Sequence, residues 1–145
     1  MSAMNVADEI DAYIAGQPDA KAADLRELNE RIVQLMPGCR LWFLDGTNDA
    51  GKVVTNPNIG YGSYLTTLAD GTTRDFYQVG LSANTSGISV YVMGIPDRGY
   101  LPATYGHNIG KATVTGYCIK FRKVTDIELD VLDAAIRDGL ARSSR

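Results

Sequence analysis

The spacing of the hydrophobic residues changes twice along this chain, and this change limits what the chain can fold into. Up to residue 35 these residues recur every three or four positions, from about residue 40 to 121 every second position, and after residue 124 every three or four again. A period near 3.6 is typical of amphipathic helices, and a period of two is typical of half-buried strands. The sequence therefore predicts N-terminal helices, a central group of strands and a C-terminal helix.

Two helices are expected before the strands. Gly16-Gln17-Pro18 interrupts the first apolar face, and Pro37-Gly38 ends the second. The C-terminal helix has the clearest start, because Thr125 and Glu128 are spaced as a capping box. Gly139 is expected to end that helix.

About five strands are expected, near residues 40–44, 60–68, 73–81, 88–93 and 113–121, with the second and third joined as a hairpin at Asp70-Gly71. Two long loops, 45–57 and 94–111, interrupt them, and loops of this length are usually functional or mobile. Helices at both ends of a mainly antiparallel sheet predict an α+β fold, a two-layer sandwich in which the helices cover one face of the sheet. Residues 1–145 are expected to form a single domain, because a chain of this length buries about 70% of its unfolded surface.

Composition excludes several classes of protein. The net charge of -3 argues against binding to a nucleic-acid backbone, which needs clustered positive charge. No apolar stretch approaches the roughly 20 residues of a membrane span. Only two cysteines are present, Cys39 and Cys118, without CxxC spacing, and the N-terminus has no secretory pattern. We therefore expect a cytoplasmic protein with reduced thiols.

Residues 46–52 match the phosphate-binding pattern G-x-x-x-x-G-K. Val53 stands where a Ser or Thr would hold magnesium, and the following segment, which reaches Pro57, cannot open a helix. The pattern therefore favours a Gly-rich turn over a nucleotide site.

Tyrosines and the 94–111 loop supply the candidate ligand-binding residues. Tyr64 and Tyr91 lie on predicted strands within Gly- and Ser-rich segments, where their hydroxyls can line a cleft. The loop adds Lys111 and His107, the single histidine. The alternatives are tyrosines packed at the edge of the sheet and a solvated histidine in a turn.

Carboxylates are the candidate metal ligands, because oxygen ligands suit hard cations and oxidised iron. Asp126, Asp130 and Asp133 follow at helical spacing, so all three are expected on one face of the last helix, and Asp8 and Asp11 belong to the acidic first helix. The alternative is a solvated helix face on which Asp133 pairs with Arg137. No cofactor is expected with certainty; iron is the candidate.

Several short motifs recur in an order that resembles the YdhG-like domain family, small bacterial domains of largely unknown function, some of which carry the label intracellular iron chaperone, frataxin-like. The motifs are Pro57-Asn58-Ile59-Gly60-Tyr61-Gly62-Ser63-Tyr64, Gly71, Gly80-Leu81-Ser82, Ile88-Ser89-Val90-Tyr91-Val92-Met93, Ile109-Gly110-Lys111, Cys118 and Asp126-Ile127. The resemblance runs from about residue 7 to 136. It implies terminal helices flanking an antiparallel sheet.

The family often carries a basic Pro-Arg-Lys stretch after a Gly-Phe-Ser turn, where this chain reads Ala83-Asn84-Thr85-Ser86. If that stretch and the lysine of the Gly-Lys pair hold an anion in the family, only Lys111 remains here. The loop from 96 to 108 also departs from the family's helical segment, because Pro102 and its glycines discourage a long helix.

The leading hypothesis is a non-enzymatic binding domain for a small ligand or a metal ion such as iron. One alternative is a small-molecule enzyme or sensor that uses a tyrosine-lined cleft near Lys111. Another is a protein-interaction module. The chemical identity of the ligand and the oligomeric state do not follow from the sequence.

Overall fold

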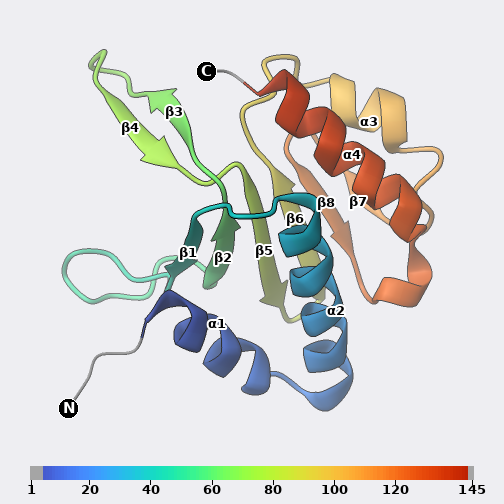
Figure 1. The fold of residues 1–145 in the computed structure, drawn as a ribbon, viewed down its shortest axis with the longest axis horizontal. Helices are drawn as coiled ribbons and strands as arrows, with labels where there is room; N and C mark the ends of the chain where they lie inside the picture. Colours follow the sequence, from blue (N-terminus) through green and yellow to red (C-terminus); the bar gives the residue numbers. More distant parts are fainter. Residues whose placement is uncertain (1–4, 144–145) are drawn as a thin grey trace.

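A computed structural model describes residues 5–143 of the chain (Figure 1). The helices are α1 (Val6–Ala15), α2 (Asp19–Leu35), α3 (Tyr100–Tyr105) and α4 (Leu129–Arg142), and a short 3₁₀ helix, η1 (Val124–Asp126), precedes the last one. The strands are β1 (Leu41–Leu44), β2 (Asn58–Tyr61), β3 (Tyr64–Thr67), β4 (Thr73–Phe76), β5 (Val79–Asn84), β6 (Gly87–Val92), β7 (Thr113–Val114) and β8 (Cys118–Phe121).

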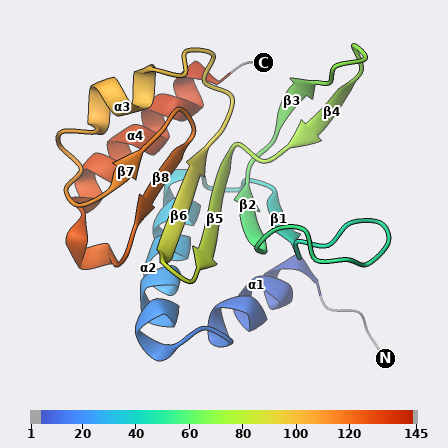
Figure 2. The same ribbon diagram turned by 180° about the vertical axis from the view of Figure 1, so that it is seen from behind.

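Six strands form one antiparallel sheet in the order β1-β2-β5-β6-β8-β7. Helices α1, α2 and α4 lie on one face of this sheet (Figure 1), and among residues 5–143 no helix crosses the other face, which Figure 2 shows from behind. The α+β class and the two-layer arrangement are confirmed. The main sheet has six strands, and β3 and β4 form a separate two-stranded sheet, so the strand number differs from about five.

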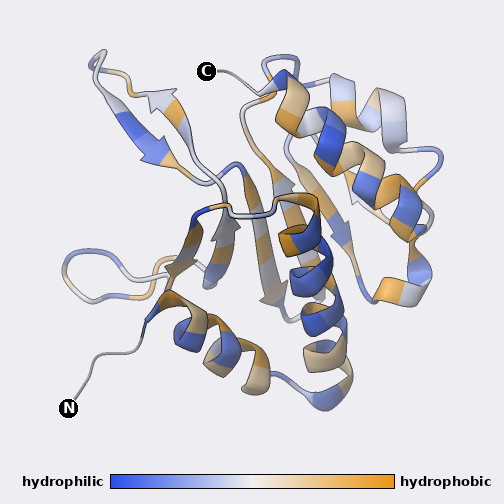
Figure 3. Cartoon of the chain, viewed as in Figure 1, coloured by the Kyte–Doolittle hydropathy of each residue, from blue (hydrophilic) through white to orange (hydrophobic). Residues whose placement is uncertain are grey.

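The core lies between the sheet and the three helices. Alternate residues of the central strands point into it, as the register Leu81–Val90–Ile119 shows, and all three are fully buried. The helices contribute buried apolar faces, which include Leu28 from α2 and Leu132 from α4. Hydrophilic and hydrophobic residues alternate around each of these helices, so that the polar ones face solvent (Figure 3).

The predicted strands 60–68 and 73–81 each break in the middle. The chain leaves the sheet at Gly62, whose φ of +75° favours glycine, and returns to it at Gln78, whose N–H donates to the carbonyl of Tyr61. The predicted hairpin therefore exists as β3 and β4, with Gly71 in its turn, but it projects away from the main sheet (Figure 1). The predicted strand 113–121 breaks in the same way between β7 and β8.

The C-terminal helix differs from its prediction at both ends. Thr125 lies within η1, and Glu128 precedes α4 with no side-chain capping bond, so the capping box does not form. Gly139 does not end the helix, which continues to Arg142. A Cβ at Gly139 would lie 2.2 Å from Cγ1 of Val92 on β6, so the glycine allows close contact between helix and sheet.

One carboxylate holds α3 against α4. Asp138 of α4 accepts hydrogen bonds from the hydroxyls of Tyr100 and Tyr105, the latter at 2.7 Å, and from Arg142 Nε at 2.9 Å. The hydrogen bond from Tyr100 contributes most, and together these bonds hold the pKa of Asp138 below its usual value.

The loop 94–111 contains one short helix, α3, in agreement with the expectation that Pro102 prevents a long one.

Helix α1 is joined to the sheet by a tyrosine hydroxyl. The N–H of Ala83 donates to Tyr13 Oη at 2.9 Å, and the same hydroxyl donates to the carbonyl of Pro57 at 3.5 Å. Ile59 and Leu81 are the last β2–β5 pair at this end of the sheet; Pro57 precedes Ile59 in the chain, and Ala83 follows Leu81. The phenol therefore connects the two strands where they separate.

Backbone amides of the 45–57 loop form hydrogen bonds with other groups of the same loop. The side chain of Asn48 accepts hydrogen bonds from the N–H groups of Ala50 and Lys52, and the N–H of Gly51 donates to the carbonyl of Asn48. This is the Gly-rich turn that the sequence favours. Within residues 5–143, no helix is long and apolar enough to cross a membrane.

Candidate functional site

A cleft of ≈ 800 Å³ lies at the end of the sheet where the β5–β6 turn, β7 and the segment after β8 meet. Its polar lining is mostly basic. The charged residues are Lys111, Lys120, Arg122, Lys123 and Asp126, and the others are Ser86, Ala112, Thr113 and Phe121. We call this the basic cleft.

Backbone contacts hold Lys111 at the basic cleft. Gly110 forms a β-bridge with Ile127, and the N–H of Lys111 donates to the carbonyl of Asp126 at 2.9 Å. Gly110 has a φ of +104°, and a Cβ there would lie 2.6 Å from that carbonyl, so only glycine fits without strain. The two motifs Gly110-Lys111 and Asp126-Ile127, far apart in sequence, therefore meet at this site.

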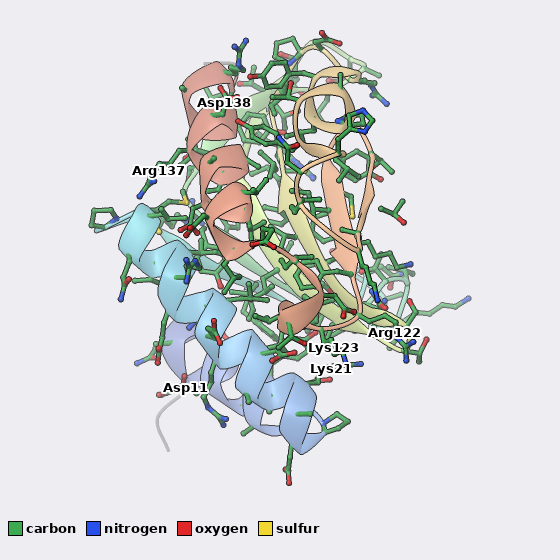
Figure 4. All side chains as sticks on the ribbon, turned by 90° about the vertical axis from the view of Figure 1, so that its right-hand side faces the viewer. Asp11, Lys21, Arg122, Lys123, Arg137 and Asp138 are labelled. Atoms are coloured by element: carbon green, nitrogen blue, oxygen red, sulfur yellow. The ribbon has the colours of Figure 1, made fainter. Side chains whose placement is uncertain are left out.

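The charged side chains of the basic cleft are not paired in salt bridges in the described part of the chain. Within residues 5–143, neither its four cations nor the carboxylate of Asp126 takes part in a salt bridge. Lys21 reaches the same end of the molecule from α2, where its Nζ donates to the carbonyl of Asn84 at 2.6 Å. Figure 4 shows Lys21, Arg122 and Lys123 together at this end. Several cations around one carboxylate create a local positive field in a protein whose net charge is -3, and such a field attracts anions.

The predicted tyrosines lie elsewhere. Tyr64 lines a second cleft, of ≈ 270 Å³, together with Met93, Ile95, Arg98 and Tyr117. We call this the tyrosine cleft. Tyr91 lies close to it, because its ring is parallel to that of Tyr117, with 6.2 Å between centroids and an angle of 19°.

The two clefts lie at opposite ends of β6. Ser86 of the basic cleft precedes this strand, and Met93 of the tyrosine cleft follows it. Six residues at about 3.3 Å each separate them by about 20 Å. The structure therefore does not bring Tyr64 or Tyr91 to Lys111. His107 is exposed in the turn after α3 and lines neither cleft.

The five candidate metal ligands do not form one group. Asp126 belongs to η1 and lines the basic cleft, whereas Asp130 and Asp133 face Arg31 of α2, at 3.7 and 2.7 Å. Asp133 thus pairs with α2 and not with Arg137. Asp8 and Asp11 lie on α1, both exposed. In the described part of the chain, no three His, Cys, Asp or Glu residues are placed to hold a metal ion.

Both cysteines are free and partly buried, and desolvation raises the pKa of each thiol. A raised pKa keeps the thiol protonated and unreactive. The free state of Cys39 and Cys118 agrees with the expectation of reduced thiols.

Sequence reasoning missed Lys120, Arg122 and Lys123 as site residues. The only signal in the sequence is the run Lys120-Phe121-Arg122-Lys123, with three cations around one aromatic residue, and such a run at the end of a strand does not by itself indicate a site. Arg98 and Tyr117 of the tyrosine cleft were missed as well.

No family model matches the chain, and no curated protein or solved structure matches it significantly. The resemblance to the YdhG-like family therefore stays a prediction based on the motifs.

Proposed function

We propose that this protein is a non-enzymatic, cytoplasmic binding domain that holds a small anionic ligand in the basic cleft. The observation that carries the proposal is that Lys111 and the three cations of residues 120–123 meet in one cleft, where none of the four forms a salt bridge within residues 5–143. Lysine and arginine side chains bind phosphate and carboxylate groups through charge-assisted hydrogen bonds. The hydroxyls of Ser86 and Thr113 add neutral donors to the same lining.

The basic cleft contains more cations than the sequence resemblance led us to expect for an anion site. From the resemblance, Lys111 was the only remaining cation, but Lys120, Arg122 and Lys123 surround it from β8 and the following segment. These cations support anion binding without the family's Pro-Arg-Lys stretch. Iron binding and a protein-interaction role remain sequence-based hypotheses, and no group of three His, Cys, Asp or Glu residues within residues 5–143 supports the first.

Calorimetric titration with pyrophosphate tests the proposal. We expect a Kd below about 1 mM at low ionic strength and weaker binding as salt is added, because salt screens exposed charges. Replacing a cation that contacts the ligand should weaken binding about tenfold, which corresponds to about 1.4 kcal/mol. Arg122→Ala and Lys111→Ala are the two variants.

Arg137→Ala is the matched control for Arg122→Ala. Both arginines are exposed, but Arg137 lies on α4 and away from the basic cleft (Figure 4). Equal weakening by the two arginine variants would show that binding follows overall charge alone and would contradict the proposal. Absence of binding to the parent protein at low salt would contradict it too.

A further inference from the structure

Four tyrosines from separate parts of the chain gather on the face of the sheet that no helix covers. They are Tyr64 of β3, Tyr77 before β5, Tyr91 of β6 and Tyr117 of the β7–β8 turn. Burial first, and then the proximity of the other three phenols, raises the pKa of Tyr77. The rings of Tyr91 and Tyr117, with 6.2 Å between their centroids, agree with this proximity.

Glycines make room for this cluster. The ring of Tyr77 lies across β2 and β5, where a Cβ at Gly60 would be 2.7 Å from its Cδ2 and a Cβ at Gly80 would be 2.6 Å from its Cε1. Tyr77 is only 5% exposed, so it is the buried member of the cluster. Tyr117, by contrast, is 51% exposed and presents its ring to solvent.

The tyrosine cleft is lined by two members of this cluster, Tyr64 and Tyr117. Its lining also includes the apolar side chains of Met93 and Ile95. A volume of ≈ 270 Å³ is slightly below the range of drug-sized pockets, so it suits a molecule with one ring. Aromatic rings and a thioether favour a flat aromatic occupant over an aliphatic one.

Arg98 is the one charged residue that lines the tyrosine cleft, and it forms no salt bridge with any of residues 5–143. Gly116 brings the backbone of Arg98 next to Tyr117, because a Cβ at Gly116 would lie 2.9 Å from the carbonyl oxygen of Arg98. The planar guanidinium matches a carboxylate in a bidentate geometry. The cleft thus combines aromatic walls with one unpaired cation.

We propose that the tyrosine cleft binds a small planar aromatic carboxylate, with the ring in contact with Tyr64 and Tyr117 and the carboxylate on Arg98. This site is separate from the basic cleft, and it does not depend on the proposed anion-binding function. It keeps part of the tyrosine-cleft hypothesis but replaces Lys111 by Arg98 as the cation.

Benzoate is the probe, and NMR titration of the backbone amides is the measurement. We expect benzoate to shift the amides of Gly94 and Gly116, which line the cleft, with a Kd of about 1 mM. Two matched molecules separate the contributions: benzamide keeps the ring without the charge, and cyclohexanecarboxylate keeps the charge without the flat ring. Each should bind at least about fivefold more weakly, since each loses one of the two interactions.

Variants locate the binding. Arg98→Gln should weaken benzoate about tenfold, and Tyr117→Leu should reduce its preference over cyclohexanecarboxylate. Arg122→Gln, which removes a cation from the basic cleft, should leave benzoate affinity unchanged. Both Arg98 and Tyr117 are exposed, so these variants are expected to fold, and their amide spectra check this.

Three results would overturn the inference. One is the absence of shifts at Gly94 and Gly116 up to about 10 mM benzoate, well above the expected Kd. Another is equal affinity in the parent protein and Arg98→Gln. The third is weakening by Arg122→Gln alone, which would place benzoate in the basic cleft.

Discussion

Replacing Gly139 by alanine should destabilise the protein, although alanine favours a helix over glycine by about 1 kcal/mol. The new Cβ would lie 2.2 Å from Cγ1 of Val92, whereas ordinary contacts begin at 3.4 Å, so α4 and β6 must move apart by about 1 Å. Overpacking a filled core costs about 1–3 kcal/mol, and such a short contact belongs at the upper end. We expect a net loss of about 2 kcal/mol in the free energy of unfolding.

Urea unfolding measures this loss, as a lower midpoint with an unchanged slope. Val92→Ala supplies the control, because it removes the methyl groups that the new Cβ would meet. The double variant should be at least as stable as Val92→Ala alone, which gives a coupling energy of about 2 kcal/mol. A Gly139→Ala protein as stable as the parent would contradict the close approach of α4 to β6.

Two further predictions concern hydrogen bonds to tyrosines. The pKa of Asp138 is lowered, so the stability that its bonds provide is present above about pH 5 and is lost as the pH falls through the folded-state pKa. Asp138→Asn should therefore lower the free energy of unfolding at pH 7 but have little effect near pH 2. The control Asp130→Asn, at an exposed position, should not show this pH-dependent loss. Equal pH profiles of the two variants, measured by urea unfolding, would argue against this. Tyr61→Phe removes a hydroxyl that donates to Asn29 Oδ1 at 2.6 Å and should lower the free energy of unfolding by about 1–2 kcal/mol. Tyr117→Phe, at an exposed position, should lower it by almost nothing. Similar melting temperatures for the two variants would rule out a stabilising bond from Tyr61.

The alternation of apolar residues predicted the centre of the sheet well. In β6, Ile88, Val90 and Val92 point into the core as a period of two requires. The same pattern could not predict that residues 60–68 form two strands, because the break depends on the sign of φ at Gly62, and glycine adopts either sign with similar ease. The capping-box pattern failed for a related reason, since tertiary contacts of η1 hold Thr125 outside the helix.

Lys111 is the site residue that both the sequence and the structure place at the basic cleft. Its partners Arg122 and Lys123 escaped prediction because they follow a strand, where exposed charges are ordinary. Their role depends on β7 folding back along β8 and on the bridge between Gly110 and Ile127. Such pairings join distant residues, and no local pattern predicts them.

The hydroxyl of Tyr13 has a consequence for the motions of the chain. Because it holds Ala83 on one strand and Pro57 beside the other, α1 cannot detach without leaving that backbone N–H without its partner. Unfolding of the first helix and parting of β2 from β5 should therefore occur as one cooperative event. Hydrogen exchange at Ala83 would then report the loosening of α1, a segment distant from it in the sequence.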